Sequence, residues 1–354
     1  MVTIRKINPL PSTHRDPDFQ SLHRLVDAYN HELIGGPEWD SDPVADLELG
    51  HRTAHLAERH RWFAELDGQP VGYANLRIDL RDAPDVGNAL IYVLPEHRRR
   101  GIGSQLLATL NGFVSERGLR KLVAWMDTPV PTGETVSPAH GVGAVPADHD
   151  GIKMALRDGY KLGQVERVSR YDFAKPLVDP QEAFAQAKAK AGDDYEIVTW
   201  IGPAPDELLD DIARLKERMT RDVPSGDLEM TEQHWDADRV RETDEQYGSS
   251  FKFYRAVARH VPTGTLVGLN DLVRDKSNDK AFVEQWDTVV LAAHRGHRLG
   301  MLVKAANILQ VREAEPTAKS IITWNAEENR HMLAVNEALG FHEFMREAAF
   351  EKPL

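Results

Sequence analysis

The chain has 354 residues, no cysteine and a net charge of −13. This length suits two domains of ordinary size, each with a hydrophobic core of its own. The lack of cysteine excludes disulfides, thiolate metal sites and thiol nucleophiles, and the acidic charge argues against a nucleic-acid partner. No apolar run reaches membrane-spanning length and the first residues do not form a signal peptide, so we expect a cytoplasmic protein without a membrane partner.

Hydrophobic periodicity in the first half predicts alternating strands and helices. In chain order the expected elements are a strand at 2–7, a helix at 19–28, strands at 61–66, 71–78 and 89–94, a helix from about 104 to 118, a strand at 121–126, a helix at 152–157 and a strand at 165–173. Asp67-Gly68 is a hairpin signal between two of the strands. Residues 129–151 carry Pro and Gly without periodicity, which is typical of a long loop.

The second half predicts the same order of elements after a helix-forming tract at 181–192, which has almost no large apolar residues and is expected to be a linker helix. The expected elements are a strand at 195–200, a helix at 207–218, an acidic loop at 222–229, strands at 251–258, 266–273 and 282–291, a helix, a strand at 320–324 and a last helix that ends at Gly340.

One junction between a strand and a helix carries three arginines and two glycines. The apolar run 91–94 leads into Arg98-Arg99-Arg100-Gly101-Ile102-Gly103, and the helix opens near Ser104. Glycine lets the backbone approach a ligand closely, and the first N–H groups of a helix have no intrahelical partner and attract anions. The pattern therefore predicts a cradle for a phosphate or pyrophosphate.

The cradle recurs in the second half as Arg295-Gly296-His297-Arg298-Leu299-Gly300. Arg295 and Gly300 follow Arg98 and Gly103 by 197 positions. A repeat of this length has the size of a domain and is too long for a solenoid unit. We therefore expect two related domains in tandem, at 1–176 and 195–354, joined by a linker helix at 177–194.

The order of strand, Arg-x-x-Gly-x-Gly, helix, strand and a helix ending in Gly-aromatic resembles the GCN5-related N-acetyltransferase (GNAT) family. The two-domain layout is similar to the tandem acetyltransferases of actinobacteria, a group that includes mycothiol synthase. The resemblance implies an α/β (α+β) fold in which each domain has a mixed, mostly antiparallel sheet flanked by helices. It also implies acetyl-CoA as co-substrate, with its pyrophosphate on the cradle and its pantetheine arm in a splay between two strands.

The same resemblance assigns residues to the coenzyme. Val93 takes the strand position that pairs with pantetheine, and Asn329 is a better candidate than Asn325 for an amide contact. Arg298 stands where the second cradle should have its first glycine, and it either adds a phosphate contact or blocks the close approach of the backbone. The candidate coenzyme residues are Val93, Arg98, Arg99, Arg100, Gly101, Ile102, Gly103, Ser104, Leu291, Arg295, Gly296, His297, Arg298, Leu299, Gly300, Asn325 and Asn329.

Acetyl transfer to an amine needs a base, because deprotonating a lysine-like ammonium at pH 7 costs about 4–5 kcal/mol. Glu284, on the strand before the second cradle, is our candidate, whereas the strand 88–94 has no carboxylate. Asp287 is second choice, since strand alternation should turn it to the other face. The tyrosine acid of many family members is replaced by Asn336 and Ala155, which is tolerable because a thiol with a pKa of about 8.5 leaves readily.

The expected function is therefore transfer of an acetyl group from acetyl-CoA to a primary amine of a small molecule, which makes the protein an acyltransferase. Acidic residues in the loops at 35–43 and 222–229 favour a cationic amine. The alternative is a sensor or scaffold that binds an acyl-CoA without turnover. Because Glu284 lies in the second half, we expect the C-terminal domain to be catalytic and the N-terminal domain to bind coenzyme or serve structure. The reverse assignment stays open, since the intact glycine motif is N-terminal, and the chain is a monomer or a homodimer. No metal is expected, because the histidines at 51–60 have no further ligand at metal-binding spacing.

Overall fold

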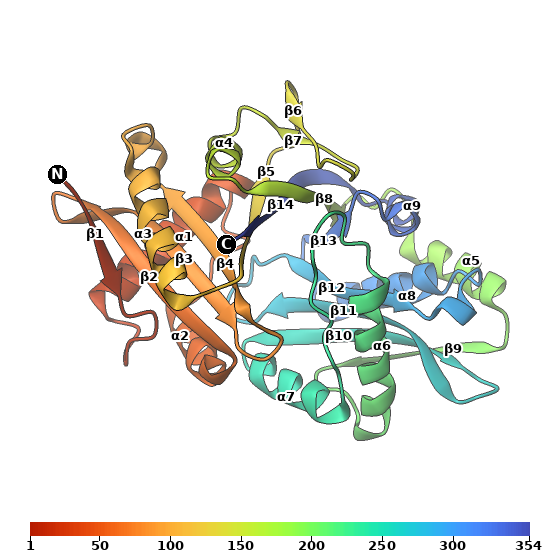
Figure 1. The fold of residues 1–354 in the computed structure, drawn as a ribbon. Coiled ribbons are helices and arrows are strands. Elements are labelled where there is room, and N and C mark those ends of the chain that lie inside the picture. The colour runs from red at the N-terminus through yellow and green to blue at the C-terminus, as the bar shows by residue number, and fades with distance from the viewer. The chain divides into compact units, whose positions relative to one another are not determined.

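The structure is a computed structural model that describes residues 1–354. The chain divides into two compact units. Unit 1 comprises Met1–Glu166, Ser225–Thr231 and Met345–Leu354, and unit 2 comprises Arg167–Pro224 and Glu232–Phe344. Two short segments thus belong to unit 1 although they follow residues of unit 2 in the sequence. Figure 1 shows the elements of both units.

Unit 1 is built around a sheet with the strand order β1-β2-β3-β4-β5-β14. Neighbouring strands are antiparallel, except for the parallel pair β4 and β5. The elements are β1 (Val2–Ile7), α1 (Pro17–Ile34), α2 (Pro43–Arg52), β2 (Ala57–Leu66), β3 (Gln69–Asp79), β4 (Ala83–Val93), α3 (Ile102–Arg117), β5 (Lys121–Thr128), β6 (Thr135–Val136), β7 (Val145–Pro146), α4 (Asp150–Arg157), the start of β8 (Lys161–Asp172) and most of β14 (His342–Pro353).

Alternation along the strands decides which helix covers which face of this sheet. On β2, Trp62 and Ala64 pack with Leu106 and Leu110 of α3. Phe63, between them, points to the opposite face and packs with Leu22 and other residues of α1. The sheet of unit 1 is therefore covered by α3 on one face and by α1 on the other (Figure 1).

Unit 2 repeats this arrangement with the strand order β13-β12-β11-β10-β9, in which only β12 and β13 are parallel. The elements are α5 (Pro180–Ala191), β9 (Tyr195–Ile201), α6 (Leu209–Asp222), α7 (Ala237–Gly248), β10 (Phe251–His260), β11 (Thr265–Asp275), β12 (Val283–Val290), α8 (Leu299–Ala314), β13 (Ser320–Ala326) and α9 (Arg330–Leu339). Helix α6 packs on one face through Ile212 and Leu215, and α8 packs on the other through Leu302 and Val303.

The parallel strand pair of each unit is short and then opens. The ladder between β4 and β5 covers Val86–Asn88 and Lys121–Val123, and the ladder between β12 and β13 covers Val283–Gln285 and Ile321–Thr323. Beyond these three residue pairs no ladder joins the two strands of either unit. Both units therefore contain a splay directly before their glycine cradle.

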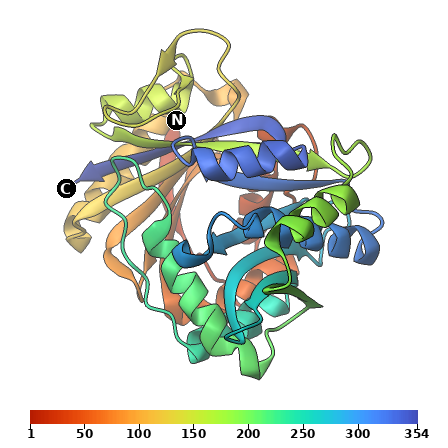
Figure 2. The same ribbon diagram turned by 90° about the vertical axis from the view of Figure 1, so that its right-hand side faces the viewer.

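The expected fold class is confirmed, and the predicted strands and helices are present with shifted ends. Helices α2 and α7, the short pair of β6 and β7, and the last strand β14 were not predicted. The tract expected to be a linker forms α5, which lies beside α8 (Figure 2). Its small side chains are buried there, at Ala183, Ala187 and Ala191, so a helix with few large apolar residues still packs closely.

The prediction that Glu284 and Asp287 lie on opposite faces is wrong. Between them the register of β11 and β12 shifts, because Asp271 pairs with Asp287 and Leu272 pairs with Gln285, which leaves Trp286 as an extra residue. This β-bulge cancels one step of the alternation. Glu284 and Asp287 therefore lie on the same face of the sheet.

The end of the chain completes the sheet of unit 1. Residues Arg346–Pro353 of β14 pair antiparallel with Lys121–Thr128 of β5. The buried Lys121 ammonium fastens this pairing, since Nζ donates to Glu351 at 2.9 Å and to the backbone oxygen of Glu229 at 2.6 Å. The last ten residues and the segment around Glu229 are thus structural parts of unit 1.

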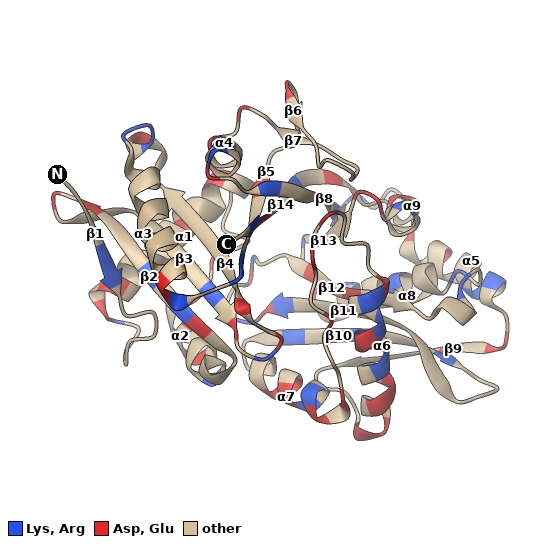
Figure 3. Cartoon of the chain, viewed as in Figure 1, with Lys and Arg blue, Asp and Glu red and all other residues tan.

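None of the helices combines the length and apolar composition that a bilayer crossing requires. In Figure 3 basic and acidic residues interleave along α6 and α7. Many of them pair within the same helix, including Arg218 with Asp222 at 2.7 Å and Arg241 with Asp238 at 2.8 Å.

Candidate functional site

The first cradle holds the start of α3 against the splayed strand β4. Gly101 is the residue before the helix and has a left-handed backbone with φ +79°. Gly103 lies in the first turn, where an added Cβ would be 3.5 Å from Met154 Sδ and 3.9 Å from Val93 Cγ2. No side chain caps the N-terminus of this helix. No side chain of the protein therefore occupies the N–H groups of the first turn, where the sequence predicted an anion.

Arg98 stabilises the turn that leads into this cradle. Its guanidinium donates to both carboxylate oxygens of Glu32 on α1, at 2.7 and 2.5 Å, while Nε donates to the backbone oxygen of Val93 at 2.8 Å. The Tyr92 hydroxyl also donates to Glu32, at 3.1 Å. Desolvation opposes ionisation of Glu32, but these hydrogen bonds outweigh it and lower the pKa of the carboxyl group.

The two following arginines remain at the surface. Arg99, whose side chain is 67% exposed, pairs with Asp150 at 2.5 Å, and Arg100 is exposed. Of the three cradle arginines, Arg98 thus holds the protein's own turn, Arg99 forms an exposed ion pair with Asp150, and Arg100 is exposed to solvent beside the helix N-terminus.

A cavity of about 640 Å³ extends from this cradle into the splay of unit 1. It is bounded by the second half of β4, by residues 124–127 of β5, by α3 and by α4. Val93, Gly103 and Leu107 line the end near the cradle, and Tyr29 and Asp127 belong to the same lining. The predicted opening between the two strands is therefore a real cavity, and a carboxylate lines it.

Histidine and tyrosine side chains complete the polar lining of this cavity. Burial lowers the pKa of His149 below its usual value, and its Nδ1 atom is buried without a hydrogen-bond partner. The imidazole is therefore neutral at pH 7. Burial raises the pKa of Tyr29 well above 10, helped by the negative charges of Asp127, Glu347 and Glu32, so this phenol keeps its proton.

The second cradle has the same backbone with the residue types exchanged. The two left-handed positions are Arg99 and Gly101 in the first cradle, with φ +61° and +79°, and Gly296 and Arg298 in the second, with φ +88° and +57°. The first left-handed position is thus arginine in unit 1 and glycine in unit 2, and the second is glycine in unit 1 and arginine in unit 2. An added Cβ at Gly101 meets no atom within 4 Å, so the position has room for a side chain. Arg298 accordingly fits the turn that the glycine forms in unit 1.

The support of the cradle is repeated as well. Arg295 Nε donates to the backbone oxygen of Val290 at 3.2 Å, and its guanidinium donates to Asp222 at the end of α6 at 2.8 Å. These contacts correspond to those of Arg98 with Val93 and with Glu32 at the end of α1. The repeated arginine of each unit therefore ties its cradle to the first long helix of that unit.

Beyond the cradle, unit 2 differs from unit 1. Lys304 occupies the α8 position that corresponds to Leu107, but it is only 1% exposed. Its ammonium donates to Asn336 at 2.5 Å, and Asn336 donates to Asn325 at 2.6 Å. The side chain of Asn329 caps α9 by accepting from the N–H of Met332 at 3.2 Å. Both asparagines assigned to the coenzyme thus make internal hydrogen bonds.

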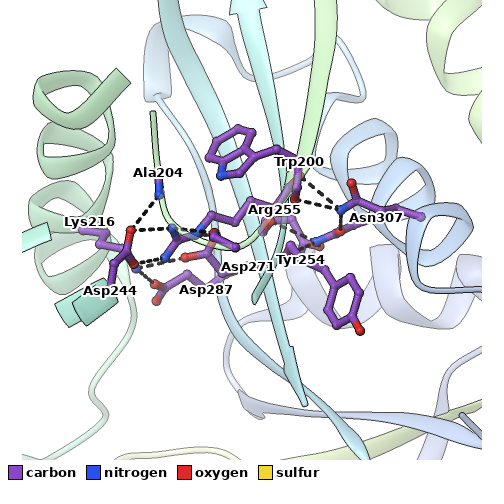
Figure 4. Close-up of polar contacts among 12 residues, drawn as sticks. Trp200, Ala204, Lys216, Asp244, Tyr254, Arg255, Asp271, Asp287 and Asn307 are labelled. Atoms are coloured by element: carbon purple, nitrogen blue, oxygen red, sulfur yellow. Dashed lines mark hydrogen bonds and ion pairs between the residues drawn. The ribbon is translucent and has the colours of Figure 1, made fainter. Parts of the chain in front are cut away.

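The carboxylates near β12 belong to a buried charge network, drawn in Figure 4. The Lys216 ammonium lies between Asp271, at 3.0 Å, and Asp287, to which it also donates a hydrogen bond. Arg255 donates to Asp244 from α7, at 2.7 Å for one of the two bonds. Asp287 is therefore neutralised by Lys216. Glu284, partly buried, stands opposite Val273 in the ladder.

Several residues of the cavity in unit 1 were not expected from the sequence. Asp127 directly follows the predicted strand 121–126. A carboxylate at the end of a strand beside the cradle could therefore have been recognised from the sequence as a candidate site residue. Glu32 and His149 gave no local signal, because α1 and the long loop before α4 place them. The candidates of the second cradle remain together around the start of α8, while Glu284 lies several residues before it on β12.

Comparisons with known proteins agree with this geometry. The structure is similar to a tandem GNAT protein from the clavulanic acid biosynthesis pathway, with 22% identity, coverage of 100% of this chain and 98% of that chain, and a TM-score of 0.75. It is also similar to a GCN5-related N-acetyltransferase from Sphaerobacter thermophilus, with 15% identity, coverage of 99% and 95%, and a TM-score of 0.60. No curated protein sequence matches the chain.

The fold of the whole chain is thus that of tandem GNAT proteins. Residues 20–132, which include the first cradle, match the model of the Acetyltransferase (GNAT) family. By sequence this region is thus similar to the GNAT acetyltransferases. The predicted resemblance is confirmed at this level, and the narrower likeness to mycothiol synthase stays a prediction.

Proposed function

We propose that the protein transfers an acetyl group from acetyl-CoA to a primary amine of a small molecule, and that the reaction takes place in the cavity of unit 1. The observation that carries this proposal is the position of the cavity. One end lies at the uncapped N-terminus of α3, and the carboxyl group of Asp127 lines it further along. The family match of residues 20–132 covers the cradle and most of the cavity's strands.

The residues around the cavity fit the coenzyme. The N–H groups at the start of α3, with Arg99 and Arg100 beside them, would hold the pyrophosphate. The unpaired edge of β4 near Val93 would pair with the pantetheine arm inside the splay. Bound in this way, acetyl-CoA supplies the acyl carbon, whose C–S bond breaks as the C–N bond to the acceptor forms.

Asp127 is our candidate base in this unit. An acceptor amine reaches the cavity as an ammonium, which the Asp127 carboxylate attracts and from which it takes a proton, leaving a neutral amine that can attack the thioester. A second proton must reach the departing thiolate. Tyr29 and water are the groups in this part of the cavity that hold a proton at neutral pH.

The cationic acceptor predicted from the acidic loops has support in unit 1. The carboxyl group of Asp127 lines the cavity. A positively charged group of the acceptor beside a carboxylate there would bind more strongly than a neutral one. Polyamines, diamines and aminoglycosides are the acceptors to examine first.

Release of coenzyme A tests the proposal directly. Because the chain has no cysteine, a thiol reagent reports only the thiol that the reaction frees. We expect release with a cationic amine, and a loss of about 10²-fold or more in kcat for Asp127→Asn. Glu284→Gln, the base predicted for unit 2, is the comparison variant and should retain the rate.

A strong loss in Glu284→Gln with a normal rate in Asp127→Asn would move the reaction to unit 2. Tight binding of acetyl-CoA without thiol release for any amine would favour the alternative, a protein that binds an acyl-CoA without turnover.

A further inference from the structure

His149 lies at the wall of the cavity in unit 1, directly before the first residue of α4. Its imidazole does not cap the helix, and neither of its ring nitrogens forms a hydrogen bond with the protein. Nδ1 is buried, so Nε2 is the nitrogen that a molecule in the cavity can reach. Polar groups inside proteins nearly always have a hydrogen-bond partner. An imidazole without one, at the wall of a cavity, is therefore available to a bound substrate.

The ring lies beside β5 because the helix that follows it starts very close to that strand. A Cβ added at Gly151 would be 3.3 Å from Cε1 of His149 and 2.5 Å from Sδ of Met126 on β5. The ring also feels the charges of Arg98 and Glu32, which hold the turn after β4. The imidazole is thus near the ends of both splayed strands, where the proposed function places the pantetheine arm and the thioester.

Four charged groups act on this ring, and most of them are paired with one another. They are Asp148 and Asp150 beside it in the chain, Arg98 from the cradle loop and Glu32 from α1. Arg98 pairs with Glu32, and Asp150 pairs with Arg99. Loss of hydration is therefore the largest influence, and it lowers the pKa of the imidazole. A proton that reaches this ring is held weakly, which suits a group that receives a proton and passes it on.

Resting on the function proposed above, we propose that His149 is a catalytic residue that moves a proton from the nitrogen of the acceptor to the departing thiolate. After Asp127 has taken one proton, the neutral amine attacks the acyl carbon, and its nitrogen becomes positively charged as the C–N bond forms. Nε2 takes a proton from this nitrogen. The C–S bond then breaks with both electrons going to sulfur, and Nε2 gives the proton to the thiolate.

This route balances without any further reactant. The imidazole ends the cycle neutral, and Asp127 releases the first proton to water. The last transfer is favourable, because a thiol has a reference pKa of about 8.5 and binds a proton more tightly than an imidazolium whose pKa is lowered by burial. The second proton that the thiolate needs thus comes from the acceptor itself.

Replacement of the imidazole and its return as a free molecule test this proposal. In His149→Ala, with the amine that releases coenzyme A fastest in the wild type, we expect kcat to fall about 10²-fold or more. Added imidazole should enter the space left by the side chain and raise this rate about tenfold or more, after subtraction of its reaction with acetyl-CoA alone. Pyrazole has the same shape but is a much weaker base, and it should not raise the rate. Restoration by neither compound, or by both equally, overturns the proposal.

His140→Ala is the matched control, because it makes the same change in the same loop. The side chain of His140 is 85% exposed and lies 3.4 Å from Asp227. This variant should keep the rate of the wild type and should not respond to imidazole. An equal loss of rate in both variants would mean that any change in this loop slows the reaction, which contradicts a specific role for His149.

His149→Gln decides the question if the alanine variant does not fold. Glutamine fills much of the same space with an amide that does not take up a proton at neutral pH. We expect kcat to fall as in the alanine variant, whereas the affinity for acetyl-CoA, measured by calorimetry, should match that of the wild type. A normal kcat, or a loss of acetyl-CoA affinity that accompanies the lower kcat, contradicts the assigned role.

The two proposals fail in different ways. If the wild type releases no coenzyme A with any amine, the proposed function fails and this inference falls with it. If the wild type is active and His149→Gln is equally active, the function stands and the role of His149 is rejected.

Discussion

Gly101 and Arg298 occupy the same place in two copies of one turn and have the same left-handed backbone, at φ +79° and +57°. Such a conformation costs an ordinary residue roughly 1–2 kcal/mol and costs glycine nothing comparable. The arginine persists in unit 2 because the surrounding turn, with Arg295 bonded to Val290, keeps the same shape.

Replacement of Gly101 by alanine should therefore destabilise unit 1. We expect a loss of about 1 kcal/mol in the free energy of unfolding, since alanine would have to keep the left-handed conformation. Gly112→Ala in the middle of α3 is the control, because an added Cβ there meets nothing within 4 Å and glycine inside a helix costs about 0.5–1 kcal/mol relative to alanine. Urea unfolding should thus give opposite signs for the two variants.

Arg98→Lys should weaken the binding of acetyl-CoA. A lysine cannot donate to both oxygens of Glu32 and at the same time to the Val93 carbonyl, so the turn before the cradle loses its fixed shape. We expect KM for acetyl-CoA to rise about 10-fold, which corresponds to about 1.4 kcal/mol. Arg295→Lys makes the same change in unit 2 and should leave this KM unaltered. Equal effects of both variants would indicate that both cradles serve the reaction.

The number of coenzyme molecules bound per chain should be one. In unit 2 the α8 position that corresponds to the cavity residue Leu107 is taken by the buried Lys304, which is bonded to Asn336. Titration calorimetry with acetyl-CoA should therefore give a stoichiometry of one. Gly103→Leu, which forces a side chain toward Val93 and Met154, should abolish binding, whereas Gly300→Leu should preserve it. A stoichiometry of two would show that Arg298 and the second cradle also hold the coenzyme.

Lys304→Met should stabilise unit 2 at pH 7. Burial lowers the pKa of Lys304 to about 7, so the unfolded chain binds the proton more tightly than the folded chain does. The wild type therefore loses stability as pH falls from about 10 to 7, and the loss is complete below pH 7. Methionine avoids this cost, and we expect a gain of about 1–3 kcal/mol at pH 7 that becomes smaller at pH 9.5. Urea unfolding at the two pH values checks it. A gain that is the same at both values would show that Lys304 does not titrate in this range.

Most elements of the fold and both cradles were readable from the amino-acid sequence. Apolar spacing located the strands and helices, and Gly101, Gly103 and the residues 197 positions later marked two strand-to-helix turns, because helix and turn formation depend on residues close together in the chain. The same local patterns indicated the GNAT fold, which the structural likeness and the family match of residues 20–132 support.

Which acidic and basic side chains lie together around the cavity was decided only by the tertiary structure. The pairing of Glu347 with Asp127 joins strands 220 residues apart, and the bulge at Trp286 turns Asp287 onto the face of Glu284. The two hydrogen bonds from Arg98 to Glu32 likewise join the cradle loop to the C-terminal end of α1. Strand partners and registers follow from how the whole sheet buries its two faces, so no short stretch of sequence determines them.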